Sequence, residues 1–296
     1  MSKLTKKSVA RLFPQLRQDA NKYTRGTCEL VVGDRNFPGA GVLATMAATR
    51  MGAGYVKTYT SDKTAIALRI ALPSAVVAPF KQYGLECHAQ DTSHPSATVV
   101  GCGLAGTEGN MTLVRSVIAA AAVPLVIDGG GLTAIATESG FAALAEHRLN
   151  GFPAILTPHG GEAARLIAAL PLDCEEEADP RNPAQQALQI ARAYDAVCVL
   201  KGPQTYIARP DDTSIKSVAV FDGGTPALAK AGTGDILAGC TGALLAQGLE
   251  PYVAAALGVV VHGTAGVLAA KKMGAFCTTA EDVLRFLPKA VMEVAE

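Results

Sequence analysis

Short apolar runs rich in β-branched residues alternate with alanine-rich stretches of helical length, and this alternation restricts the fold more than any other feature of the chain. Strands that are apolar throughout are typical of a parallel sheet with helices on both faces, so the pattern predicts a doubly wound α/β fold. The predicted strands are 30–32, 97–100, 124–127, 154–156 and 196–200. The predicted helices are 40–51, 110–122, 162–170, 183–194 and 236–247.

The rest of the chain fits the same architecture. Residues 215–221 form a less apolar run, which predicts a strand near one edge of the sheet. Residues 174–183 are acidic and contain proline, so we expect a surface loop there. No repeat or low-complexity linker divides the 296 residues, and we expect one domain over 1–296, with 1–20 as an N-terminal extension.

Charge and cysteine usage exclude several classes of protein. Lysine and arginine number 26, as do aspartate and glutamate, and this zero net charge is not expected of a nucleic-acid-binding protein. The seven cysteines never occur as C-x-x-C, which indicates a reduced, cytoplasmic protein rather than a disulfide framework or a zinc site. His262 and Thr264 interrupt the longest apolar stretch, 253–270, which favours a packed core helix over a membrane span.

In a doubly wound sheet, ligands bind beyond the carboxyl ends of the strands, so the residues that follow each predicted strand are candidates for chemistry. Residues 33–40 are mostly small and polar, and they would let a ligand approach the backbone at a helix start. Residues 101–106 satisfy G-x-G-x-x-G, and Asp128 ends the next strand, so an NAD-binding fingerprint is one interpretation. Asp128 could otherwise hold magnesium through water, contact a ligand hydroxyl, or only form a turn before three glycines.

His159 and Glu162 stand three residues apart where another strand passes into a helix, and this spacing allows both side chains to face the site. Glu162 could instead only complement the helix dipole. His159 lies beside two glycines, which favours a functional role. The other histidines show no metal-ligand spacing; they are His88, His94, His147 and His262.

The strongest candidate is the run Gly232-Thr233-Gly234-Asp235, directly before an apolar helix. Its small residues leave backbone amides that point to one spot, which predicts an anion hole for a phosphate or a developing oxyanion. Asp235 lies at the mouth of this hole. The helix dipole favours its ionised form, so we expect a role as base only with a phosphate or metal nearby. Lys201 and Gly202 add a cation and a tight turn after another strand.

In this order, the motifs resemble the ADP/ATP-dependent NAD(P)H-hydrate dehydratase family of the ribokinase-like superfamily. The Gly-Thr-Gly-Asp run is shared with sugar and vitamin kinases and indicates the superfamily, whereas Thr-Pro-His-x-Gly-Glu indicates the dehydratase. The resemblance extends over about 21–288 and rests on the runs 21–26, 37–40, 100–104, 157–162, 200–202 and 231–239.

The resemblance implies a ribokinase-like, mostly parallel sheet and an ADP-dependent or ATP-dependent lyase that returns hydrated NADH and NADPH to NADH and NADPH. It implies that Asp235 is the catalytic base and that magnesium is organised by Glu162 through water. It also implies a homo-oligomer, with a tetramer as one form. By position, the dinucleotide contacts are Ala40, Gly103, His159 and Asp235, the nucleotide contacts are Lys201, Gly202, Pro203, Gln204, Thr205 and Gly234, and the anion hole is Gly232, Thr233 and Gly234.

Three other functions stay open at this point. A ribokinase-like kinase for a sugar or a thiamine-precursor alcohol would return a stable phosphorylated product. An NAD-dependent oxidoreductase would use residues 101–106 and Asp128, but it leaves residues 232–235 without a purpose. A non-catalytic nucleotide-binding protein would not need Asp235.

Overall fold

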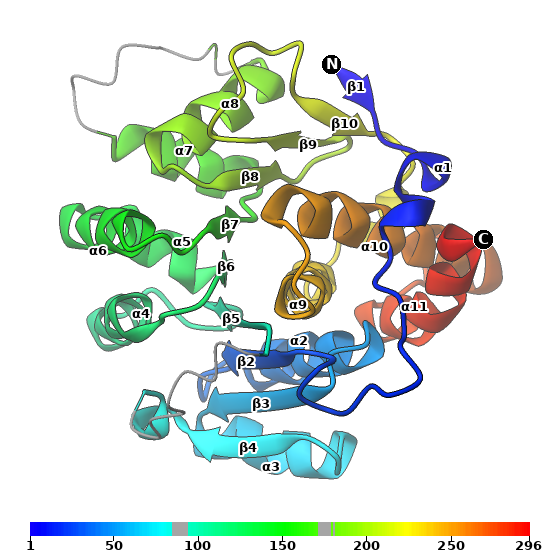
Figure 1. The fold of residues 1–296 in the computed structure, drawn as a ribbon, viewed down its shortest axis with the longest axis horizontal. Coiled ribbons are helices and arrows are strands. Elements are labelled where there is room, and N and C mark those ends of the chain that lie inside the picture. The colour runs from blue at the N-terminus through cyan, green and yellow to red at the C-terminus, as the bar shows by residue number, and fades with distance from the viewer. Residues whose placement is uncertain (85–93, 171–178, 180) are drawn as a thin grey trace.

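The structure, a computed structural model, describes residues 1–84, 94–170, 179 and 181–296. In these residues, ten strands form one central sheet of the order β1-β10-β9-β8-β7-β6-β5-β2-β3-β4 (Figure 1). The strands are β1 (Ser2–Lys3), β2 (Thr27–Val31), β3 (Tyr55–Thr60), β4 (Val76–Pro79), β5 (Ser96–Val100), β6 (Leu125–Ile127), β7 (Ala154–Leu156), β8 (Val197–Leu200), β9 (Thr205–Ala208) and β10 (Ala219–Phe221).

Most of the sheet is parallel, as predicted. The strands from β8 to β4 in that spatial order are parallel to one another, whereas β9 is antiparallel to β8 and to β10. The short strand β1 pairs with β10 at one edge, so part of the predicted N-terminal extension belongs to the sheet.

Helices cover both faces of the sheet (Figure 1). One layer contains α2, α9, α10 and α11, and the other contains α4 to α8. In chain order, the α-helices of the described residues are α1 (Lys6–Val9), α2 (Pro38–Arg50), α3 (Asp62–Ala71), α4 (Glu108–Ala120), α5 (Gly130–Ile135), α6 (Glu138–Leu149), α7 (Gly160–Ala168), α8 (Pro183–Ala193), α9 (Thr233–Ala246), α10 (Pro251–Met273) and α11 (Ala280–Ala295), and the 3-10 helices are η1 (Ala10–Leu12), η2 (Phe80–Gln82) and η3 (Pro226–Leu228).

Successive residues of the central strands point to opposite layers, which explains why both faces of these strands carry buried apolar residues. Leu30 and Val99 belong to the core beneath α2, α9 and α10. Their chain neighbours Val31 and Val100 belong to the core beneath α4 to α8. All four side chains are fully buried.

Each predicted strand and helix is present, with ends that differ by a few residues. Helix α2 begins at Pro38 rather than at residue 40, because the fixed φ of proline suits the first turn of a helix. The predicted strand 215–221 lies next to the edge strand but is only three residues long, since Ser217 closes a turn onto Ser214. The predicted surface loop 174–183 lies largely outside the described residues.

The longest apolar stretch forms α10, which among the described helices is the one long and apolar enough to cross a membrane. Its most apolar window is 83% buried inside the protein. His262 and Thr264, near the middle of this helix, are 8% and 3% exposed. The predicted core helix is therefore confirmed.

Candidate active site

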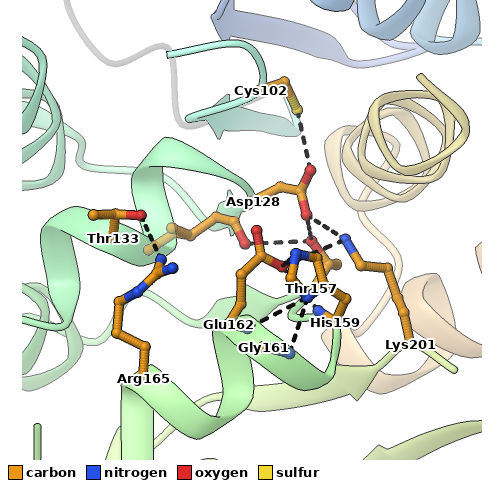
Figure 2. A network of polar contacts seen from close by, with 10 residues as sticks. Cys102, Asp128, Thr133, Thr157, His159, Gly161, Glu162, Arg165 and Lys201 are labelled. Atoms are coloured by element: carbon orange, nitrogen blue, oxygen red, sulfur yellow. Dashed lines mark hydrogen bonds and ion pairs between the residues drawn. The ribbon is translucent and has the colours of Figure 1, made fainter. Parts of the chain in front are cut away.

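The carboxyl ends of four adjacent parallel strands bring distant residues into one polar network (Figure 2). Cys102 follows β5, Asp128 follows β6, Thr157 follows β7 and Lys201 follows β8. Their side chains converge because parallel strands end at the same edge of the sheet. The residues of this network therefore lie where ligands are expected to bind, beyond the carboxyl ends of the parallel strands.

Asp128 is the centre of this network. Its Oδ1 accepts hydrogen bonds from Thr157 Oγ1 at 2.7 Å and from Lys201 Nζ at 2.8 Å. Its Oδ2 accepts a hydrogen bond from the Cys102 thiol at 3.7 Å. Burial works against the charged form, but Lys201 and these hydrogen bonds still bring the pKa of Asp128 below its usual value. The same pairing raises the pKa of Lys201 against the effect of burial, so both groups are ionised.

His159 and Glu162 form the start of α7. His159 Nδ1 accepts from the amides of Gly161 at 3.0 Å and Glu162 at 3.4 Å, and Glu162 Oε2 accepts from the His159 amide at 2.8 Å. This reciprocal arrangement is a capping box, a structural role for both side chains that adds to any contact with a ligand. The His159 side chain is still 61% exposed, and Glu162 Oε2 lies 4.0 Å from Lys201 Nζ. Burial, followed by the charge of Asp128, raises the pKa of Glu162 although Lys201 opposes this effect.

The predicted anion hole lies at the start of α9. Gly232 has a φ of 92°, which favours glycine, and no described side chain caps this helix. The Thr233 hydroxyl donates to the carbonyls of Leu228 at 2.7 Å and Lys230 at 2.9 Å, so it stabilises the preceding turn instead of facing a ligand. A β-carbon on Gly234 would lie 3.4 Å from Lys201 Nζ, so the lysine ammonium is next to this helix start.

Asp235 carries the most informative electrostatic feature of the site. Burial, and then the negative charge of Asp128, raise the pKa of Asp235 to about 7 although Lys201 acts in the opposite direction. The helix dipole was expected to favour the ionised form, whereas burial and the charge of Asp128 favour the protonated form of this carboxyl group. A carboxylate with a pKa near neutrality suits a general base.

The loop after β2 brings Ala40 and Gly103 together. Asp34 accepts hydrogen bonds from the amides of Asn36, Phe37 and Ala105 and from the Asn110 side chain, which ties this loop to the loop after β5. Gly103 has a φ of 62°, and a β-carbon there would lie 2.5 Å from the β-carbon of Ala40. These two predicted dinucleotide contacts are therefore neighbours, and Cys102 links them to the network around Asp128.

The NAD-binding interpretation of residues 101–106 does not fit this geometry. A β-carbon on Gly101 would lie 2.0 Å from the carbonyl oxygen of Asp128, so this glycine serves the close packing of two loops. Helix α4 begins only at Glu108. Both carboxylate oxygens of Asp128 have partners from the protein, so Asp128 is not available to bind a ribose as that interpretation requires.

The predicted nucleotide-contact run connects β8 to β9. Lys201 forms an isolated parallel bridge with His159, so the two predicted contact residues are adjacent in the backbone. Gly202, Pro203 and Gln204 are exposed in the turn beyond it, and Thr205 begins β9. This run is therefore open to a ligand beside the anion hole.

His262 is a feature of the site that sequence reasoning assigned to no role. It lies in α10, is 8% exposed and has a hydrogen bond to the backbone of Thr233 at the start of α9. Burial lowers its pKa to about 4, so the imidazole is neutral at physiological pH. The signal in the sequence was a histidine within an apolar run, which does not by itself indicate a contact with another helix.

Two groups of side chains could be considered for a metal ion. Ligand atoms of Cys102, Asp128 and Asp235 lie within 4.8 Å of one another. Asp128 is paired with Lys201, and burial keeps the pKa of the Cys102 thiol well above its usual value, so this group does not fit magnesium. Glu162 fits better, because its contacts among the described residues all involve Oε2 and leave Oε1 for a water-coordinated ion.

The sheet order, the open amides at the start of α9 and the adjacent carboxylate and lysine define a protein of the ribokinase-like class. A ribokinase-like superfamily protein from Enterococcus faecalis superposes with a TM-score of 0.79 at 25% identity, over 99% of this chain and 96% of that one. The chain belongs to the NAD(P)H-hydrate dehydratase family, whose family model matches residues 28–289.

Individual relatives agree with this assignment. An ADP-dependent (S)-NAD(P)H-hydrate dehydratase from Xanthomonas campestris is 34% identical over 90% of this chain and 88% of that protein. The Bacillus subtilis ADP/ATP-dependent NAD(P)H-hydrate dehydratase, co-crystallised with ATP and Mg²⁺, has a TM-score of 0.79 at 28% identity, over 98% of this chain and 97% of that one. The chain spans about half the length of the bifunctional NAD(P)H-hydrate repair enzymes that it also matches.

Proposed function

We propose that this protein dehydrates hydrated NADH and NADPH, with ADP as the phosphoryl donor and ATP as an alternative donor. The observation that carries the proposal is the position of Asp235, a carboxylate with a pKa raised to about 7, at an uncapped helix start beside Lys201. A base that titrates near neutral pH next to an uncapped helix start is suited to phosphoryl transfer to a hydroxyl, because the base can accept the hydroxyl proton and the free amides can bind phosphate oxygens.

In this proposal, Asp235 accepts the proton of the ring hydroxyl. The hydroxyl oxygen then attacks the terminal phosphorus of the nucleotide. The backbone amides at Gly232, Thr233 and Gly234, together with the ammonium of Lys201, neutralise charge on the transferring phosphoryl group. The carbon–oxygen bond then breaks, inorganic phosphate leaves with the bonding electrons, and a neighbouring ring carbon loses a proton to restore the double bond. ADP yields AMP in this sequence.

The remaining contacts follow the positions of the family motifs. Ala40, Gly103 and His159 would contact the dinucleotide, and the first two are already adjacent. The exposed turn of Gly202, Pro203 and Gln204, extended by Lys201 and Thr205, would hold the nucleotide together with Gly234. Glu162 would hold Mg²⁺ through water, and the ion would supply positive charge near the phosphates.

The test is the recovery of the near-ultraviolet absorbance of NADH when purified protein is mixed with hydrated NADH, Mg²⁺ and either ADP or ATP. Recovery with stoichiometric release of inorganic phosphate supports the proposal, and the faster nucleotide identifies the donor. A stable phosphorylated product without recovered absorbance would instead indicate a small-molecule kinase of the same fold.

We also propose a cytoplasmic homo-oligomer, with a tetramer as one form. The five described cysteines are free, as expected of a reduced compartment. The oligomeric state rests on the family resemblance, and light scattering coupled to size-exclusion chromatography measures it directly.

A further inference from the structure

A cavity lies at the same edge of the sheet, beyond the loop that holds Ala40 against Gly103. It has a volume of about 540 Å³ and lies at the carboxyl ends of β3 and β4. Asp34 and Asn110, which tie the loops after β2 and β5 together, form one wall. Phe80 also belongs to the lining. The cavity is therefore separated from the predicted dinucleotide contacts by one loop.

Three cationic side chains line this cavity: Arg35, Lys63 and Lys81. All three are exposed, and within the described residues none of them forms an ion pair. Two carboxylates, Asp34 and Asp62, also line it, so the lining carries three positive and two negative side chains, and Asp34 already accepts four hydrogen bonds from the protein. Unpaired cations that converge on one cavity favour an anionic ligand.

The backbone adds to this preference. Helix α3 is ten residues long and begins at the cavity, where its cap residue Ser61 and its first residues Asp62 and Lys63 are part of the lining. The positive end of a helix dipole attracts an anion, and phosphates are frequent ligands there. Cavity, cations and helix start therefore indicate the same kind of ligand.

The position of the cavity relates it to the active site. The strands β6, β5, β2 and β3 are consecutive neighbours, so the end of β3 is three strand spacings, about 14 Å, from Asp128 at the end of β6. An extended dinucleotide spans that distance, and its phosphates lie one ribose or more away from the nicotinamide ring. A ring at Asp235 therefore leaves the phosphate-bearing part free to reach this cavity.

We propose that the cavity binds a phosphate group of the hydrated dinucleotide, with Arg35, Lys63 and Lys81 as its cationic contacts. This inference rests on the proposed function. Either the diphosphate bridge or the 2′-phosphate of the NADPH form supplies the required chemistry. In both cases these side chains hold the substrate and take no part in proton or phosphoryl transfer.

The test is a Lys63→Gln/Lys81→Gln double variant of the full chain, with Lys216→Gln as the matched control. Lys216 is exposed and lies in the turn before β10, away from the cavity lining. The double variant is expected to raise the KM for hydrated dinucleotide about tenfold. Its kcat and its KM for ADP are expected to stay within twofold of the wild type, as in the control.

The two hydrates distinguish the two phosphate sources. An equal rise in KM for both hydrates supports the diphosphate, and a larger rise for the NADPH form supports the 2′-phosphate. An unchanged KM for both hydrates, or a rise equal to that of Lys216→Gln, overturns the inference.

A binding experiment separates this inference from the proposed function. Fluorescence titration measures the affinity of the wild type and both variants for NADPH, without turnover. If the wild type does not dehydrate the hydrates, the proposed function fails, and weaker NADPH binding by the double variant alone still supports the phosphate site. Equal NADPH binding by all three proteins overturns the phosphate site whatever the activity.

Discussion

The ammonium of Lys201 lies 2.8 Å from Oδ1 of Asp128 and forms an ion pair with it at the edge of the sheet. This pair keeps Asp128 ionised, and the remaining negative charge, together with burial, raises the pKa of the neighbouring Asp235. Three carboxylates, from Asp128, Glu162 and Asp235, therefore share one lysine. Among these three carboxylates, Asp235 has its pKa raised to about 7.

The substitution Asp235→Asn tests the assignment of the base. It preserves the size of the side chain but cannot accept the hydroxyl proton, so we expect kcat to fall by about 10³-fold with ADP affinity within twofold of the wild type. The rate is measured by the recovery of NADH absorbance, and the affinity by calorimetry. Asp222→Asn, which removes an exposed partner of Lys3, is the matched control and should keep full activity. Substantial turnover by Asp235→Asn would refute the assignment.

The pH dependence of the rate tests how Asp128 tunes Asp235. The base must be ionised, so kcat/KM should fall on the acid side with an apparent pKa of about 7. Asp128→Asn removes a negative charge that raises the pKa of Asp235, and the acid limb of the profile should move to lower pH by about one unit.

Two further measurements make the Asp128 experiment specific. Loss of this carboxylate leaves Lys201 without its closest partner, so we expect the free energy of unfolding to fall by about 3 kcal/mol, measured by urea denaturation. Thr157→Val removes a 2.7 Å hydrogen bond from Asp128 but keeps its charge. The acid limb should stay in place in that variant, and an equal shift in both variants would argue against a charge effect.

Because the helix start of α9 is open, a substitution there should weaken nucleotide binding without lowering the stability of the fold. Gly234→Ala places a β-carbon 3.4 Å from Lys201 Nζ, an ordinary contact distance, so the fold should tolerate it. The added methyl group obstructs the space where we propose that phosphate meets the amides, and the KM for ADP should rise about tenfold. Gly109→Ala, at a helical position with nothing within 4 Å, is the control and should leave this KM unchanged. An unaltered KM in Gly234→Ala would place the phosphate elsewhere.

Sequence patterns predicted the fold well because a sheet that is covered on both faces needs apolar residues at successive positions of its strands. The apolar run of Leu30, Val31 and Val32 is typical of a sheet covered on both sides, and its residues alternate between the two cores. The rule that ligands bind at the carboxyl ends of parallel strands then led to Asp128, Glu162 and Lys201, which the structure brings into one network.

The electrostatics of the site could not be predicted in the same way. The pKa of Asp235 depends on burial and on the charge of Asp128, which belongs to a distant part of the chain. The capping role of His159 depends on the ring orientation, and the contact of His262 depends on how two helices pack. The cavity beside α3 has no motif at all, since Arg35, Lys63 and Lys81 come from three separate segments, which are the loop after β2, the first turn of α3 and the 3-10 helix η2.

The raised pKa of Asp235 also predicts that the base destabilises the fold when it is ionised. The pKa is about 7 in the folded protein and close to the model-peptide value of about 3.9 in the unfolded chain. The folded state therefore binds more protons between these two values, and the free energy of unfolding should decrease as the pH rises through this interval and level off above it.

Asp235→Asn removes this dependence. The variant should be more stable than the wild type by a few kcal/mol at pH 8, and the gain should shrink through the interval from pH 7 to pH 4 and vanish below it. Urea denaturation of both proteins at several pH values measures the difference, with Asp222→Asn as the control for loss of an exposed carboxylate. A variant that is inactive and also less stable than the wild type at pH 8 would contradict a pKa raised by burial. In that case, removing the ionised carboxylate would not have removed any destabilisation of the fold.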